Sequence, residues 1–245
     1  MPTKPELEGA SIVVIGNFNP AIFHPMWFKV NELLADAEAD TAELDFVSSE
    51  ITSFTTKWCR VQVLAERFSV ETTDSARIPE IVDLVRGVFS QLEHCPIRAF
   101  GLNRHFHFKM ASEAEWHAIG HLLAPKAIWE PVVESPGTRS LSIWSAVTEE
   151  NECRSRLQVR FEPSGKVRPG VFFEINRHYD VLAVADDAID TSPEDARELA
   201  FLTDGTRVLQ EVLPDAWRDF ERESEHVVQH ILSTAKSTPS DEEPS

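Results

Sequence analysis

Hydrophobic periodicity in the first half of the chain predicts a mixture of strands and helices. The apolar run Ser11–Phe18, which includes Gly and Asn, is typical of a buried strand. Apolar residues recur every three or four positions over Ile78–Leu92, which predicts a helix, and Ile97–Lys109 predicts a long strand. Two more helices are expected, over His24–Ala37 and over Ser112–Leu123, which begins with the Ser-x-x-Glu pattern of a capping box.

Strand-like alternation and turn residues divide the remainder of the chain. The segments 43–54 and 58–73 each predict a strand. Turns rich in Gly, Pro and Asn then separate four strand-like runs, 127–134, 139–148, 153–162 and 168–181. The C-terminal quarter predicts two helices, of which the first ends near Leu213 and the second begins at Pro214.

One short motif occurs twice and suggests an internal duplication. Asn103-Arg104-His105-Phe106 ends one predicted long strand, and Asn176-Arg177-His178-Tyr179 ends another. Earlier in each half, Cys59-Arg60 and Cys153-Arg154 open a strand. The pattern predicts an α+β fold of two related antiparallel-sheet lobes, each with helices packed on one face, and a C-terminal pair of helices.

The predicted domain boundaries follow from this arrangement. Residues 1–9 and the acidic tail 237–245 are polar and contain prolines, which is typical of disordered ends. We expect the first α+β lobe over 10–110. We expect the second over 111–236, with the C-terminal helices included.

Charge restricts the class of partner. The 245 residues carry 23 Lys and Arg against 41 Asp and Glu, a net charge of −18, which argues against nucleic-acid binding because such surfaces need basic patches. Residues 185–245 hold 16 of the acidic residues and only 5 basic ones. This surplus is consistent with a solvated helical face, with a nucleic-acid mimic, or with a docking surface for a basic protein partner.

Cysteine usage and hydropathy indicate the compartment. The three cysteines, at positions 59, 95 and 153, include no Cys-x-x-Cys pair and favour a reducing cytosol. The sequence contains no run of about 18 apolar residues, so we expect no membrane span. We therefore expect a cytoplasmic protein without a cofactor, which binds a protein partner or a second copy of itself.

Two strand segments, Gly101-Leu102-Asn103-Arg104 and Phe173-Glu174-Ile175-Asn176, carry a resemblance to a known family. The pattern is a long strand, a helix and a strand ending in an Asn, followed by a second lobe that ends in a similar strand. It resembles a sporadically distributed, uncharacterised prokaryotic family over about residues 10–235. The resemblance implies a two-lobed α+β body and a prokaryotic origin. It implies no catalytic residue.

The segment Gly16-Asn17-Phe18-Asn19-Pro20 follows a predicted strand and precedes a predicted helix. It resembles the first motif of the nucleotidyltransferases that make adenylated cofactors, in which a Gly-(Ser/Thr)-Phe-(Asn/Asp)-Pro segment precedes a Gly-His at a helix N-terminus that favours phosphate. Here His24-Pro25 replaces Gly-His, so the Gly is missing and the His is one residue early. The candidate phosphate-binding residues are Gly16, Asn17, Asn19 and His24. The other interpretation is a plain strand–turn–helix connection.

Two histidine pairs form a candidate metal site. His105 and His107 are two residues apart on a predicted strand, and His117 and His121 are four apart on a predicted helix, so each pair shares a face. Four imidazoles could bind zinc or a similar metal. No carboxylate stands at a ligand spacing, so half-buried or surface histidines are the alternative.

The repeated Asn-Arg-His segment is a second candidate binding site. Arg104 and Arg177 could bind an anion bidentately, with His105 and His178 as titrating neighbours and Asn103 and Asn176 beside them. The alternative is that both arginines form ion pairs with the abundant carboxylates. The sequence contains no complete catalytic motif.

These observations predict a non-enzymatic role. We expect a protein-interaction or regulatory component of a prokaryotic cytosolic system, which binds its partner through a sheet face, the inter-lobe groove or the acidic C-terminal helices. The competing prediction is a nucleotide- or phosphate-binding enzyme or sensor that uses Gly16–Pro20 or the Asn-Arg-His pair. A pocket on which these residues converge would favour the enzyme or sensor. An exposed acidic or apolar surface would favour the interaction component.

Overall fold

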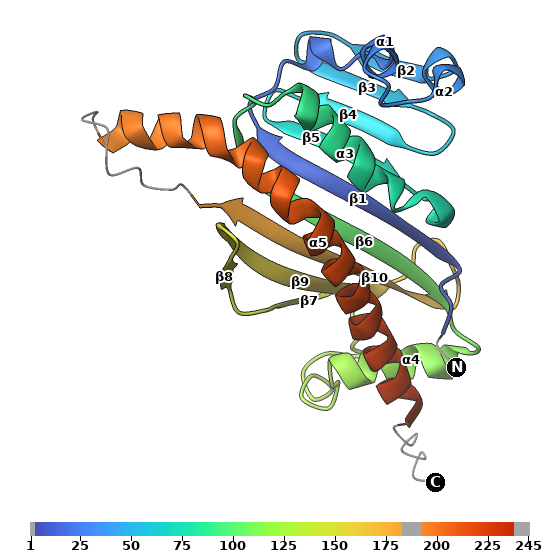
Figure 1. Ribbon diagram of the computed structural model, residues 1–245. Helices are drawn as coiled ribbons and strands as arrows, with labels where there is room; N and C mark the ends of the chain where they lie inside the picture. Colours follow the sequence, from blue (N-terminus) through green and yellow to red (C-terminus); the bar gives the residue numbers. More distant parts are fainter. Residues whose placement is uncertain (1–2, 183–192, 238–245) are drawn as a thin grey trace.

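The fold is built on one antiparallel sheet with helices packed on one of its faces (Figure 1). The computed structural model describes residues 3–182 and 193–237, the stretches 193–204 and 236–237 by their backbone alone. The strands lie in the order β2-β3-β4-β5-β1-β6-β10-β9-β7, and β8 also pairs with β9. They are β1 (Leu7–Gly16), β2 (Glu43–Val47), β3 (Ile51–Thr55), β4 (Arg60–Leu64), β5 (Arg67–Thr72), β6 (Ile97–Lys109), β7 (Leu141–Trp144), β8 (Thr148–Glu150), β9 (Cys153–Pro163) and β10 (Gly170–Val181).

Two helices cover the same face of the sheet. α3 packs on β1 and β5, and α5 crosses β6 and β10 while contacting α3 (Figure 1). The helices are α1 (Pro25–Val30), α2 (Asp36–Asp40), α3 (Glu80–Gln91), α4 (Glu113–Leu123) and α5 (Pro193–Ser237), with 3-10 turns η1 (Pro20–Ile22) and η2 (Ser75–Arg77). The predicted α+β class is confirmed. None of the described helices is long and apolar enough to cross a membrane.

The alternation of side chains along the strands decides which face is buried. On β1, Ile12 is fully buried beneath the helices, and the register places Val70 of β5 and Leu102 of β6 beside it. The next position along β1, Ser11, points to the other face, where Asn103 lies opposite it. The helical face therefore carries the core and the opposite face carries polar side chains.

The two halves of the chain share this sheet, which corrects the expected pair of separate lobe sheets. β6 and β10 pair from Ala99↔Asp180 to Lys109↔Gly170, and Asn103 lies opposite Asn176 in the middle of that pairing. The repeated Asn-Arg-His segments are therefore related by a local twofold axis. The Cys-Arg segments do not follow this symmetry, because β5 and β1 lie between β4 and β6, whereas β9 is next to β10. A duplication of whole lobes is not confirmed.

The expected C-terminal pair of helices is one continuous helix. α5 runs from Pro193 to Ser237 and contains Pro214 in its interior. Proline removes a backbone donor and usually breaks or kinks a helix. Here Leu213 and Trp217 are 0% and 5% exposed, so packing on the sheet maintains the helix across the proline. Figure 1 shows that α5 bends along its length.

α5 lies very close to the sheet at Gly205. A Cβ at this position would clash with the backbone carbonyl of Ile97, the first residue of β6. One residue further on, the Thr206 hydroxyl donates a hydrogen bond of 2.8 Å to the Cys95 carbonyl. These contacts fix the position of the helix against the start of β6.

Three local predictions are wrong. The helix expected over 24–37 is divided into α1 and α2, because Glu32 adopts a left-handed conformation with φ 57°. The segments 43–54 and 58–73 are not single strands but the hairpins β2–β3 and β4–β5. The run 127–134 forms turns instead of a strand.

The chain becomes ordered earlier than residue 10. The Thr3 backbone N–H donates to Gln229 Oε1 at 2.9 Å, and Gln229 Nε2 donates to the Thr3 carbonyl at 2.7 Å. β1 then begins at Leu7. The predicted disordered N-terminus is therefore corrected from residue 3 onward, and positions 238–245 of the predicted tail lie outside the described residues.

Candidate functional site

Arg104 joins the sheet to α5. It is 3% exposed. Its guanidinium donates to Glu225 Oε1 at 3.0 Å, to the Glu221 carbonyl at 3.3 Å and to Glu8 Oε2 at 3.2 Å. Because these partners occupy both terminal nitrogens of its guanidinium, Arg104 is a structural contact, and it lines none of the cavities described below.

Arg177 occupies a more open position on the same face. Its Nε and Nη2 donate to the Glu223 carboxylate of α5 at 3.1 and 2.6 Å, in the bidentate geometry typical of arginine. Its Nη1 donates to the Ser155 hydroxyl at 3.3 Å. Unlike Arg104, Arg177 lines a cavity.

The asparagines and histidines of the repeated motif lie on the opposite face of the sheet. Asn176 Nδ2 donates to Asn103 Oδ1 at 2.7 Å across the local twofold axis. His178 Nε2 lies 3.0 Å from Asp180 Oδ1. His105 lies against Gly9, where a side chain would clash with its ring. The six predicted ligand-binding residues are thus divided between two faces and do not form one pocket.

The four predicted metal ligands are not brought together. His107 is 5% exposed, and its Nδ1 lies 2.9 Å from the Ser164 hydroxyl. His105 lies beside it, with the two rings 6.3 Å apart. His117 and His121 are exposed on α4. Among the described residues, no group of three or more His, Cys, Asp or Glu could hold a metal ion.

Burial keeps the two strand histidines neutral. Desolvation, together with the positive charge of Lys166, lowers the pKa of His105 to about 4. Desolvation and Lys166 also lower the pKa of His107. The Ser164 hydroxyl already accepts from two backbone N–H groups, so it donates its own proton to His107 Nδ1. Both imidazoles are therefore uncharged at neutral pH and serve as packing groups of the sheet.

The turn Gly16–Pro20 is packed by its own neighbours. A Cβ at Gly16 would clash with the carbonyl of Pro96. The Asn19 side chain accepts from the Ala21 N–H at 3.2 Å, and His24 Nδ1 accepts from the Met26 N–H at 3.1 Å, so both residues cap short helices. Asn17 and Asn19 border a cavity of about 350 Å³ whose described lining includes no lysine or arginine. The four predicted phosphate-binding residues do not converge on it.

A larger groove lies between α5 and the β8–β9 hairpin. Its volume is about 570 Å³. Six carboxylates line it, and Arg177 is the only Lys or Arg among its described lining residues. The carboxylates are Glu150, Glu152, Glu211, Asp215, Asp219 and Glu223. Both walls of the groove are therefore acidic.

The acidic wall on α5 has a regular spacing. The four helical carboxylates, from Glu211 to Glu223, occur at every fourth residue. At a rise of 1.5 Å per residue, neighbours are about 6 Å apart along the axis, and the row extends about 18 Å. The opposite wall is the turn that carries Glu150 and Glu152.

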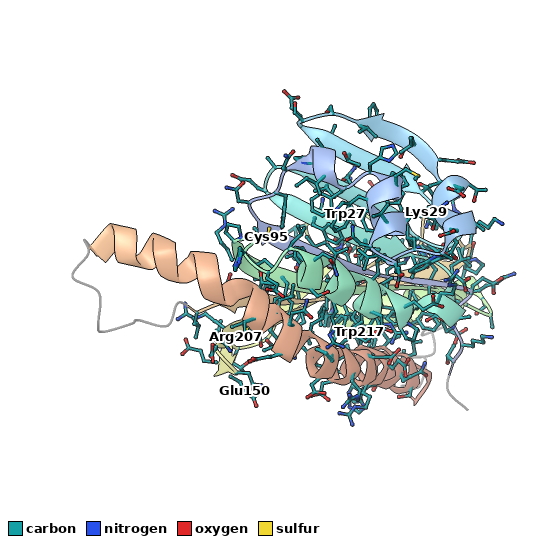
Figure 2. All side chains as sticks on the ribbon, turned by 45° about the horizontal axis from the view of Figure 1, so that its top comes forward. Trp27, Lys29, Cys95, Glu150, Arg207 and Trp217 are labelled. Atoms are coloured by element: carbon teal, nitrogen blue, oxygen red, sulfur yellow. The ribbon has the colours of Figure 1, made fainter. Side chains whose placement is uncertain are left out.

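Arg207 of α5 links the groove's two walls at one end. Arg207 Nη2 lies 2.6 Å from Glu152, and its Nη1 lies 2.9 Å from Glu211, so this side chain joins the hairpin to α5. Figure 2 shows Arg207 and Glu150 on the same flank of the molecule. Glu150 forms no ion pair with any described residue.

The remaining arginines at the rim neutralise the row only weakly. Arg218 lies 3.1 Å from Asp215, and both side chains are about two-thirds or more exposed, at 68% and 76%. Arg222 pairs with Asp219 in the same i, i+3 arrangement, at 75% and 68% exposure. Exposed pairs of this kind contribute about 0–1 kcal/mol, so both carboxylates can exchange partners at little cost.

The floor of the groove is aromatic and aliphatic. Tyr179 is 9% exposed, and its ring stacks on Phe100 with the centroids 4.6 Å apart. Three residues of α5, Val208, Ala216 and Phe220, complete the buried floor. Burial raises the pKa of Tyr179, so the phenol is protonated.

Sequence reasoning identified only part of this groove. Its candidate site residues include Arg177, and it proposed the acidic C-terminal helices as a docking surface. Tyr179 is only the last residue of the repeated motif there, and Glu150 and Glu152 are not among the candidate site residues. The four-residue spacing of the acids on α5 was a usable indication, because it predicts one row on a helix. The turn gave no comparable pattern.

Comparison with known proteins gives no assignment. No protein-family model matches the chain. No curated protein matches it either.

Proposed function

We propose that this protein is a non-enzymatic interaction component of a prokaryotic cytosol, and that it binds a basic segment of a protein partner in the groove between α5 and the β8–β9 hairpin. The groove itself carries this proposal. It joins six carboxylates to a buried apolar floor, which suits long cationic side chains with apolar stems.

Charge supports a basic partner over a phosphate ligand. The chain has a net charge of −18, and the groove lining concentrates the same sign. A cleft lined by one sign of charge attracts the opposite sign and accelerates association. A phosphate would be repelled by the same carboxylates, and Arg177 is already held by Glu223 at 2.6 Å. The nucleotide-sensor alternative remains a prediction without a supporting pocket.

The spacing of the α5 carboxylates matches regular peptides. Their separation of about 6 Å equals the i, i+4 step of a helix and is close to the i, i+2 step of a strand, about 6.6–6.8 Å. A segment with Lys or Arg at such intervals would place one cation against each carboxylate. We therefore expect a periodically basic segment, not an isolated charged residue.

Fluorescence anisotropy with a labelled 12-residue peptide of alternating Lys and Ala tests the proposal. We expect saturable binding that weakens as salt rises, because the contacts are ionic. The double variant Asp215→Lys/Asp219→Lys should weaken binding about tenfold or more, since each charge pair at ~6 Å in water is worth roughly 0.7 kcal/mol and reversal changes its sign.

A matched control separates groove binding from general charge attraction. Glu130 and Glu134 are exposed in the turn segment before β7 and do not line the groove. The variant Glu130→Lys/Glu134→Lys changes the net charge by the same amount. Equal weakening in both double variants would show non-specific attraction and would contradict the proposed site.

A further inference from the structure

A small cavity lies above β5, on the face of the sheet opposite the helices α3 and α5 (Figure 1). Its volume is about 250 Å³. This is below the roughly 300–1,000 Å³ of pockets for drug-sized ligands, so the cavity suits a smaller molecule. Its described lining is entirely polar or charged, and the space is named here the β5 cavity. The lining residues are Ser11, Arg60, Gln62, Arg67, Ser69 and Glu71.

The β5 cavity is hollow because its central side chain is small. Phe68 and Val70 are fully buried beneath the helices, so Ser69 between them points to the open face. Arg67 and Glu71 stand on the same face, one on each side of Ser69 along the strand. A serine between two long charged side chains leaves the space that a ligand can occupy.

Two opposite charges border the β5 cavity without an ionic partner. Arg60 lies directly opposite Glu71 in the β4–β5 register, but its guanidinium turns to Asp45 instead, at 3.1 Å. Neither Glu71 nor Arg67 forms an ion pair with any described residue. An exposed ion pair adds little to stability, so leaving these two charges available for a ligand costs the fold little.

The charges of the β5 cavity balance, whereas those of the whole chain do not. Arg60 and Arg67 are positive, and Glu71 and the Asp45 carboxylate that holds Arg60 are negative. The chain as a whole carries −18, which disfavours an anionic ligand. A matching ligand therefore carries one charge of each sign. The Arg67 guanidinium can hold a carboxylate through two parallel hydrogen bonds, and Glu71 can accept from an ammonium.

The separation of the two charged residues sets the length of the ligand. Arg67 and Glu71 are four positions apart on β5, which is about 13 Å at a rise of about 3.3 Å per residue. A hydrogen-bonded contact of about 3 Å at each end leaves about 7 Å. Two residues of extended peptide span about 7 Å, and a single amino acid spans half of that. Between the two ends, the Ser69 hydroxyl donates to the Gln62 carbonyl at 3.3 Å and can accept from a peptide N–H.

We propose that the β5 cavity binds an unblocked dipeptide, whose carboxylate lies on Arg67 and whose ammonium lies on Glu71. The dipeptide follows the strand direction and crosses Ser69. The site is on the opposite face of the sheet from the acidic groove, so it goes beyond the proposed function and does not depend on it.

Amide chemical-shift titration of isotope-labelled protein tests the site with four probes. These are Ala-Ala, N-acetyl-Ala-Ala, Ala-Ala amide and free alanine. We expect Ala-Ala to shift the amides of residues 67–71 and to bind on the order of tenfold more tightly than the other three. Each blocked form lacks one of the two charge-assisted contacts, and free alanine is too short to make both.

Two charge-removing variants assign each end of the dipeptide. In Arg67→Gln, Ala-Ala should lose its advantage over Ala-Ala amide and keep its advantage over N-acetyl-Ala-Ala. In Glu71→Gln, the reverse should hold. The matched control is Arg154→Gln, which removes an exposed arginine of β9 that lies outside the cavity and should retain the wild-type affinity.

Filling the cavity is an independent test. Ser69→Phe should abolish dipeptide binding and leave the thermal unfolding temperature near that of the wild type, because the side chain points away from the core. Equal affinity for Ala-Ala and for either blocked form or free alanine would overturn the dipeptide assignment. The proposal would also fail if millimolar Ala-Ala caused no shifts at residues 67–71, or if Arg154→Gln weakened binding as much as Arg67→Gln.

Discussion

Mild acid should destabilise this protein through His105. Burial, with the nearby charge of Lys166, lowers the pKa of His105 from 6.5 to about 4. The unfolded chain binds a proton at this site below about pH 6.5, whereas the folded chain does not until about pH 4. The stability contributed by the neutral imidazole is therefore complete above pH 6.5 and is lost as the pH falls to about 4.

The size of the effect follows from the shift. A difference of about 2.5 pKa units corresponds to about 3 kcal/mol of unfolding free energy. Glu174 lies opposite His105 in the β6–β10 register, and its carboxylate would favour the charged imidazole, but burial and the positive charge of Lys166 outweigh it. A loss of this size is a large fraction of the stability of a typical domain.

Urea unfolding followed by tryptophan fluorescence, at several pH values between about 7.5 and 4.5, measures the effect. The comparison is between the wild type and His105→Gln, which cannot titrate. Over this range, the unfolding free energy of the wild type should fall by about 2–3 kcal/mol more than that of the variant. The difference between the two proteins cancels the contribution of the carboxylates that both share. Parallel pH profiles, or an NMR titration of His105 with a midpoint near 6.5, would refute the reasoning.

Three substitutions test the packing of the long helix and of the loop after α4. Gly205→Ala should destabilise the fold by about 1–3 kcal/mol, because its Cβ clashes with the Ile97 carbonyl, and chemical denaturation measures the loss. Arg104→Met should cost about 2 kcal/mol, because it removes charge-assisted bonds to Glu225 and other acceptors on α5 and β1, and unchanged stability would contradict that role. Lys126→Met should loosen the segment 124–138, because the Lys126 ammonium is hydrogen-bonded to two carbonyls at the end of α4. We expect faster hydrogen exchange confined to that segment, and unaltered exchange would contradict this role of Lys126.

Local sequence patterns predicted the elements whose cause is local. β6 has the predicted limits Ile97–Lys109, and α4 begins after Ser112, whose side chain accepts from the Glu115 N–H at 3.1 Å as a capping box requires. The failures have non-local causes. Pro214 was expected to start a new helix, but packing of α5 on the sheet carries the helix through it. The hairpin turn between β2 and β3 contains no Gly, Pro or Asn, so none of these residues indicates a break between the two strands.

The candidate groove could not be predicted because it is assembled from three distant segments. The hairpin that carries Glu150, the strand that carries Tyr179 and the helix that carries Asp219 meet only through the sheet order and the crossing of α5. The repeated Asn-Arg-His segment did indicate a symmetric position in the fold. Strand alternation then placed its arginines on the helical face and its other polar residues on the opposite one, which divided the predicted pocket.

The central claim is that a basic segment binds between α5 and the β8–β9 hairpin. Mapping of backbone amide chemical shifts, with isotope-labelled protein and the unlabelled lysine peptide, tests it most directly. We predict that the largest changes occur at residues 148–155 and 208–223, which line the groove. Changes centred on the opposite face of the sheet, around Asn103 and Asn176, or no changes at a saturating peptide concentration, would contradict the claim.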